Sequence, residues 1–125
     1  MPNSRIAALA FAADVTAVIV FAAVGRLSHG ESGDLLALLG TAAPFLIGLI
    51  AAWVTPAVRA APTGWRAGIA VLLGSAVLGL LLRAGFTGRL PLTFAMIAFG
   101  SLAVLLLGWR ALSVAVAHGA AQHVR

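Results

Sequence analysis

The 125-residue sequence contains no cysteine and no lysine, and it has only three acidic residues. The absence of cysteine excludes disulfides and any thiol chemistry. The three acidic residues offer no carboxylate pair at a glycosidase-like spacing. The chain also has no P-loop, dinucleotide fingerprint, zinc-protease motif or nucleophile-elbow serine. We therefore expect no cofactor, no bound metal and none of the chemistry of classical soluble enzymes.

Apolar residues dominate what is present. The chain is 62% hydrophobic and 9% charged, whereas a soluble domain is about half apolar and about a quarter charged. Four apolar segments cover about residues 6–27, 35–54, 67–86 and 90–116. Each is near the roughly 20 residues that a helix needs to cross a bilayer. The sequence predicts an all-α integral membrane protein.

The connections between these segments are short and contain turn-forming residues such as Gly33, Pro56, Pro62 and Gly88. Short connections leave consecutive helices as antiparallel neighbours. The first segment is too long for the core of a signal peptide and contains an acidic residue, so we expect it to remain as a helix. The prediction is one domain over residues 1–125, an antiparallel four-helix bundle.

Arginine counts predict the orientation in the membrane. Arg5, Arg59, Arg66, Arg110 and Arg125 fall on the side of both termini, and Arg26, Arg83 and Arg89 fall on the other side. All three tryptophans, Trp53, Trp65 and Trp109, are on the side with five arginines, where an indole suits the membrane interface. The positive-inside rule therefore predicts that both termini are cytoplasmic. Because the arginines are scattered singly, we expect no nucleic-acid binding.

Ridges of mostly small residues predict where the helices pack. They are Gly40, Pro44, Gly48 and Ala52 on the second segment, Ser75, Gly79 and Arg83 on the third, and Phe94, Ser101 and Gly108 on the fourth. Close backbone approach along such ridges replaces the hydrophobic drive between helices in lipid. We interpret all three ridges as packing faces.

Asp14 is the strongest functional signal, because a charged side chain in the bilayer costs at least about 2.5–3.5 kcal/mol. Such residues usually face the bundle interior and mark ion or proton pathways. The alternative is a protonated Asp14 that donates to a backbone carbonyl. Pro44, at a depth similar to that of Asp14, frees the carbonyl of Gly40, which lies about one turn closer to the outer face, and we predict a kink there. Asp14, Thr16 or Thr41 could donate to this carbonyl.

A second polar group is predicted near the outer face, where Arg26 and His29 end the first segment and Arg83 ends the third. One hypothesis is an electropositive vestibule of these three residues that leads toward the buried acid. The alternative is a surface network in which Glu31 and Asp34 neutralise the arginines.

His118 and His123 are five residues apart and share no helix face. With no cysteine or acidic residue nearby, they do not form a metal site.

The order of polar and small residues along the chain resembles the prokaryotic membrane proteins classed as domain of unknown function 3054. The residues that carry this resemblance are Asp14, Phe21, Gly25, Arg26, Ser28, His29, Pro44, Phe45, Gly48, Trp53, Leu81, Leu82, Arg83, Gly88, Leu107, Gly108, Trp109 and Arg110. The resemblance implies a four-helix, multi-pass protein of the prokaryotic cytoplasmic (inner) membrane. It implies no activity, cofactor or catalytic residue.

Three functions remain open from the sequence, of which transport is favoured. In that hypothesis Asp14 binds a proton or cation, and Arg26, His29 and Arg83 attract a small anionic or polar solute. Because four helices leave little room for a pathway, a homo-oligomer in the lipid bilayer is expected. The alternative is a non-catalytic accessory or structural subunit of a membrane complex. A lipid-modifying enzyme is the third, with few residues to support it.

Overall fold

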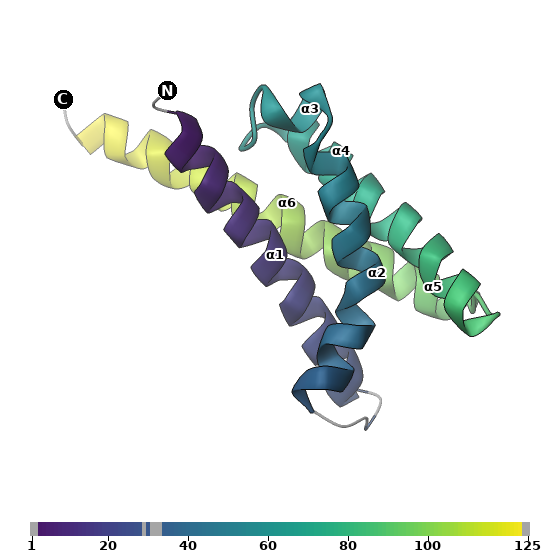
Figure 1. The fold of residues 1–125 in the computed structure, drawn as a ribbon. Coiled ribbons are helices and arrows are strands. Elements are labelled where there is room, and N and C mark those ends of the chain that lie inside the picture. Colours follow the sequence, from purple (N-terminus) through teal and green to yellow (C-terminus); the bar gives the residue numbers. More distant parts are fainter. Residues whose placement is uncertain (1–2, 29, 31–33, 124–125) are drawn as a thin grey trace.

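The computed structural model describes residues 3–28, 30 and 34–123, which form helices joined by short connections (Figure 1). In chain order the elements are α1 (Asn3–Ser28), α2 (Leu35–Trp53), α3 (Pro56–Arg59), α4 (Trp65–Leu73), the π-helix η1 (Gly74–Leu78), α5 (Gly79–Thr87) and α6 (Leu92–His123). Because α4, η1 and α5 follow one another directly, they form one long helix, which we call the third helix. The described residues contain no strand, and the predicted all-α class is confirmed.

Within the described part of the chain, four helices are long and apolar enough to cross a membrane. They are Ser4–Leu27, Leu35–Trp53, Trp65–Thr87 and Leu92–Gly119. The prediction of four apolar helices is thus confirmed. The last helix extends past residue 116 to His123, through a stretch rich in the strong helix former alanine. Proline at the first position of α3 also starts a short helix in a connection for which only turns were expected.

The helix ends follow from local sequence. Asp34 caps α2, because its side chain accepts a hydrogen bond of 3.2 Å from the backbone N–H of Ala37. Gly88 ends the third helix in the left-handed conformation, with φ of +72°, which glycine adopts without a steric penalty. Pro91 then directly precedes α6.

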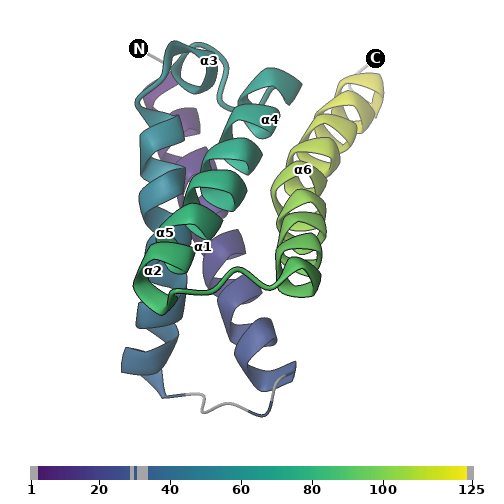
Figure 2. The ribbon, with the colours of Figure 1, turned by 90° about the vertical axis from the view of Figure 1, so that its right-hand side faces the viewer.

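The helices run up and down between two ends of the molecule. Both chain ends and α3 lie at one end, which we call the terminal end (Figures 1 and 2). The end of α1, the start of α2 and the connection from α5 to α6 lie toward the other end, which we call the opposite end. Figure 2 shows α6 set to one side of the other helices. In its most apolar window 17% of the residues are buried, against 33% in each of the other three helices.

The closest approach in the bundle is between α2 and the third helix, at Gly48 and Gly74. A Cβ added at Gly48 would overlap the carbonyl oxygen of Gly74, and one added at Gly74 would lie 2.7 Å from the carbonyl oxygen of Gly48. The predicted ridge on α2 is confirmed at Pro44, Gly48 and Ala52, which are buried. It fails at Gly40, where a Cβ would meet no atom within 4 Å.

The third helix contributes its ridge around the same crossing. Ser75 is fully buried, and a Cβ at Gly79 would lie 2.6 Å from Cδ1 of Phe45. Phe45 in turn meets Phe21 of α1 edge-on, with ring centroids 5.1 Å apart. The π-helix η1 begins at Gly74, so a local widening of the helix coincides with the crossing. Sequence periodicity predicts a regular helix here and does not reveal this widening.

On α6, the buried side chains differ from the predicted ridge. Ala98, Leu102, Leu106 and Arg110 are buried and follow one another at intervals of four residues. Gly108 is exposed, and a Cβ there would meet no atom within 4 Å, so the expectation that it packs is wrong for this chain alone. The inward face of α6 is therefore an apolar ridge that ends in an arginine.

Candidate functional site

Asp14 lies on the inward face of α1, and its exposed fraction is 0%. Ala10, Ala17, Val18 and Phe21 are buried on the same helix at spacings of three or four residues. This register places the carboxylate between α1, α2 and α6 rather than toward lipid. The prediction that Asp14 faces the bundle interior agrees with this position.

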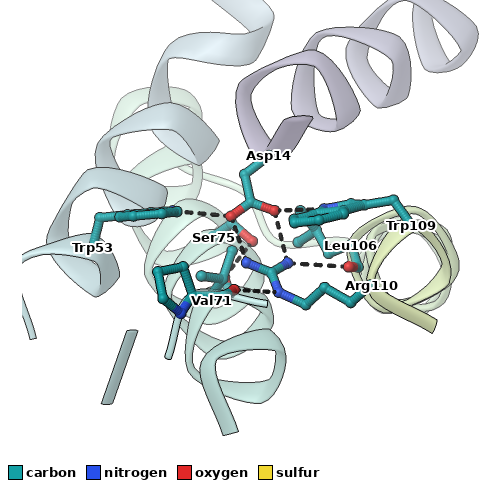
Figure 3. Close-up of polar contacts among 8 residues, drawn as sticks. Asp14, Trp53, Val71, Ser75, Leu106, Trp109 and Arg110 are labelled. Atoms are coloured by element: carbon teal, nitrogen blue, oxygen red, sulfur yellow. Dashed lines mark hydrogen bonds and ion pairs between the residues drawn. The ribbon is translucent and has the colours of Figure 1, made fainter. Parts of the chain in front are cut away.

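Each of the two carboxylate oxygens of Asp14 accepts two hydrogen bonds (Figure 3). The guanidinium of Arg110 donates to Oδ1 through NH1 and to Oδ2 through NH2, each at 2.8 Å. The indole of Trp109 donates to Oδ1 at 2.8 Å, and that of Trp53 donates to Oδ2 at 2.9 Å. We call Asp14, Trp53, Trp109 and Arg110 the Asp14 cluster. Asp14 accepts all four of these hydrogen bonds, so the alternative in which its side chain donates to a backbone carbonyl is not observed.

Arg110 has its own set of partners within the bundle. It is 3% exposed, and its Nε donates to the carbonyl oxygen of Pro62 at 3.0 Å, while NH1 also donates to that of Leu106 at 3.1 Å. The guanidinium lies 4.4 Å from the ring centroid of Trp109. Among the described residues, no buried side-chain nitrogen or oxygen lacks a hydrogen-bond partner.

The Asp14 cluster joins elements that are distant in the sequence. It draws Asp14 from α1, Trp53 from the end of α2 and two residues from α6, and Pro62 ties it to the connection before α4. Phe11, one turn before Asp14, meets the ring of Trp53 edge-on with centroids 5.3 Å apart. The cluster therefore links α1, α2 and α6 in the terminal half of the bundle.

The energetics of such a pair are asymmetric. A buried, two-pronged arginine–carboxylate pair offsets much of the cost of removing both charges from water. Removal of one partner leaves an unpaired buried charge, which costs about 3–5 kcal/mol in proteins. Arg110 is also neutralised internally by Asp14 at 2.8 Å, so it adds no free positive charge to the terminal end.

The depth predicted for Asp14 is wrong. Asp14 accepts a hydrogen bond from Trp53, the last residue of α2, whereas Pro44 lies about 13 Å earlier along that helix. Asp14 therefore lies nearer the terminal end than the proline. The expected partners of the Gly40 carbonyl are also engaged elsewhere. Thr16 donates to Ala12 at 2.8 Å, and Thr41 donates to Ala37 at 3.1 Å.

The residues predicted to form an outer vestibule contact different helices. Arg26 donates to Oγ1 of Thr41 on α2 at 2.9 Å, and the guanidinium of Arg83 lies over the ring of Phe94 on α6 at 4.8 Å. Arg26 is also about 18 Å along α1 from Asp14. His29 lies outside the described residues. The structure thus brings Asp14 together with Arg110 and two tryptophans, while Arg26 and Arg83 make their contacts elsewhere.

A family model described as "Protein of unknown function (DUF3054)" matches residues 11–113. The chain belongs to this family. The matched range contains all four residues of the Asp14 cluster. No curated protein and no solved structure matches the chain.

Three of the four residues of the Asp14 cluster have a different position from the one that the sequence predicts. Trp53, Trp109 and Arg110 were expected at the membrane interface, as anchors and as a topological charge. Arg110 follows the buried residues Ala98, Leu102 and Leu106 at intervals of four residues, and the sequence alone does not show that this series faces inward. An arginine in register with a buried ridge is a natural partner for an isolated buried acid.

Proposed function

We propose that this membrane protein of the DUF3054 family is a non-catalytic accessory subunit, and that the Asp14 cluster fixes its shape. The observation that carries the proposal is the saturation of Asp14. An ionised carboxylate has about four lone-pair sites, and Asp14 accepts four hydrogen bonds from three side chains. A cation or solute would have to displace one of these donors to reach it.

Transport, which the sequence favours, has less support from this geometry. The transport hypothesis needs a polar route from Arg26, His29 and Arg83 to Asp14. Arg26 and Arg83 instead contact Thr41 and Phe94, on two different helices. The Asp14 cluster also gives a sufficient physical reason for a charged residue within an apolar helix, because it links three helices.

An open face of α6 supports the proposal. Gly100, Val104 and Gly108 follow one another at intervals of four residues, and Val104 is 72% exposed. A Cβ at either glycine would meet no atom within 4 Å. Small residues on an open helix face let a second membrane helix approach closely. The proposal therefore takes as partner a helix of another membrane protein, seated along this face, which we call the α6 face.

We further propose that the protein lies in the cytoplasmic membrane of a prokaryote with its terminal end inside the cell. By sequence, Arg5, Arg59, Arg66 and Arg125 belong to the side of the terminal end and Arg26, Arg83 and Arg89 to the other side, and by the positive-inside rule this excess supports the orientation. Cysteine introduced singly at Ser4 and at Thr87 provides the test, because the chain has no cysteine of its own. An impermeant thiol reagent added outside intact cells should label the second variant and not the first.

Site-directed photo-crosslinking in native membranes tests the accessory function. A crosslinker at Val104 should capture a different membrane protein in a defined ratio. The same crosslinker at Leu81, which is 58% exposed on the third helix, is the matched control. A product at Val104 that contains only this chain would contradict the accessory proposal and support the homo-oligomer.

A flux measurement tests the competing transport hypothesis. The purified protein is reconstituted in liposomes with an imposed proton, sodium or chloride gradient, and the wild type is compared with Asp14→Asn. The accessory proposal expects no flux above that of empty liposomes from either protein. Flux that Asp14→Asn abolishes, while the variant keeps its fold, would overturn the proposal.

A further inference from the structure

A groove of about 660 Å³ lies between α4 and α6 at the terminal end. Ile69, Leu107 and Val114 form its apolar wall, and Trp65 and His118 also line it. Along α6 the groove extends from Leu107 to His118, which corresponds to about 16 Å of helix. This length suits an extended apolar chain.

An exposed arginine, Arg66, lies beside the lining residue Trp65, and we call this edge of the groove its rim. Trp65 is 69% exposed, and the guanidinium of the exposed Arg66 lies 5.4 Å from the centroid of its ring. The helix α4 begins at the same place, and its N-cap, Gly64, provides no side-chain cap. The unpaired N–H groups of a first helical turn carry partial positive charge and favour anions. The charged side chain and the helix end therefore favour the same kind of ligand.

The described part of the chain supplies no acid to balance this rim. The whole sequence has three acidic residues. Asp14 is occupied by Arg110, and Asp34 caps α2 at the opposite end. Glu31 lies outside the described residues. At a membrane interface the abundant anions are lipid phosphates, and basic pockets between spanning helices bind anionic lipids.

We propose that the groove between α4 and α6 binds one phospholipid with a net negative head group. Its phosphate lies at the rim, near Arg66 and the first turn of α4, and one acyl chain lies along Ile69, Leu107 and Val114. The exposed indole of Trp65 marks the level between head group and tail, where tryptophan is enriched in membrane proteins. Inorganic phosphate would use the rim alone and leave the apolar wall uncovered. The site is independent of the accessory function.

Binding is measured by native mass spectrometry and thermal unfolding of the detergent-solubilised protein. The probes are phosphatidylglycerol, phosphatidylcholine with the same acyl chains, and inorganic phosphate. Phosphatidylglycerol should bind one molecule per chain and raise the unfolding temperature. Phosphatidylcholine should bind about fivefold more weakly, as expected for the loss of one favourable charge interaction near the surface. Inorganic phosphate should have no effect.

Two variants locate the site, with a matched control. Arg66→Gln should weaken phosphatidylglycerol binding about fivefold, because the guanidinium of Arg66 lies over the lining residue Trp65. Arg59→Gln, at an exposed arginine on α3, should leave binding unchanged. Ala115→Trp, at an exposed position of the lining, should fill the groove and abolish binding. The proposal is overturned if both lipids bind equally, if inorganic phosphate reproduces the stabilisation, or if Arg66→Gln and Ala115→Trp leave lipid binding intact.

Discussion

Two contacts hold this bundle together by opposite means. In the terminal half, the Asp14 cluster joins α1, α2 and α6 through one ion pair and two indole hydrogen bonds. Nearer the middle of α2, the crossing at Gly48 and Gly74 joins α2 to the third helix with backbone against backbone. The first contact depends on which side chains are present. The second depends on the absence of side chains.

The difference bears on how membrane helices choose their partners. Lipid provides no hydrophobic drive between helices, so close packing and hydrogen bonds decide their association. The glycine contact maximises packing but tolerates any partner with a matching shape. The ion pair forms only with a helix that carries the opposite charge, because an unpaired charge in lipid is energetically unfavourable. The helix α6, which is the least buried of the four, is held against α1 by the contact that discriminates most.

The largest expected effect comes from breaking the ion pair. Arg110→Met keeps the apolar stem and leaves Asp14 without its counter-charge, so we expect a loss of about 3–5 kcal/mol in the free energy of unfolding. Unfolding is followed in mixed micelles by titration with a denaturing detergent. Arg83→Met is the control, because Arg83 is only partly buried and lies over Phe94, and it should cost less than about 1 kcal/mol.

A double-mutant cycle sharpens this result. Asp14→Leu combined with Arg110→Met removes both charges, and we expect a coupling energy of about 2–3 kcal/mol between the two sites. Additive effects of the two substitutions would contradict the ion pair as the source of the stability.

The glycine contact should give the next largest effect. Gly48→Ala places a Cβ against the carbonyl of Gly74, where neither backbone can yield without separating the helices. We expect a loss near the upper end of the roughly 1–3 kcal/mol that overpacking costs. Gly40→Ala in the same helix is the matched control, since its Cβ would meet no atom within 4 Å. It should be neutral or stabilising, and equal losses in the two variants would refute the crossing.

A smaller effect is expected at the edge of the Asp14 cluster. Trp53→Phe keeps an aromatic ring beside Phe11 and removes the indole N–H that donates to Asp14. A hydrogen bond to a charged group contributes about 1.5–3 kcal/mol, and the partly exposed position of Trp53 places the loss near the lower value. Trp65→Phe, at an exposed tryptophan, should change the unfolding free energy by less than about 0.5 kcal/mol.

The smallest effect is expected toward the opposite end. Arg26→Gln shortens the side chain that donates to Thr41, and we expect a loss of about 0.5 kcal/mol. Thr41→Val should give a similar loss by removing the acceptor. A loss above about 2 kcal/mol from Arg26→Gln would show that charge organises this end as strongly as it organises the Asp14 cluster, which would break the contrast between the two ends.

The predictions that succeeded and those that failed differ in kind. The four apolar helices follow from segment length and composition, and the buried positions of Gly48 and Gly79 follow from the spacing of small residues. The ridge through Gly108 failed because spacing alone does not show which face of α6 turns inward. The π-helix at Gly74 was not visible either, since it depends on how two backbones meet.

The sequence by itself determined that this chain is apolar enough to form four membrane-spanning helices, and that an acid at Asp14 needs a polar partner. Those conclusions depend only on transfer energies, which are properties of each segment. The identity of the partner was decided by the tertiary structure. Arg110 lies 96 positions from Asp14 along the chain, and only the rotation of α6 about its axis brings its guanidinium to the carboxylate. The sequence at position 110 would be the same whether the arginine faced lipid or Asp14. Packing against the neighbouring helices sets the rotation of α6 and so decides between the two.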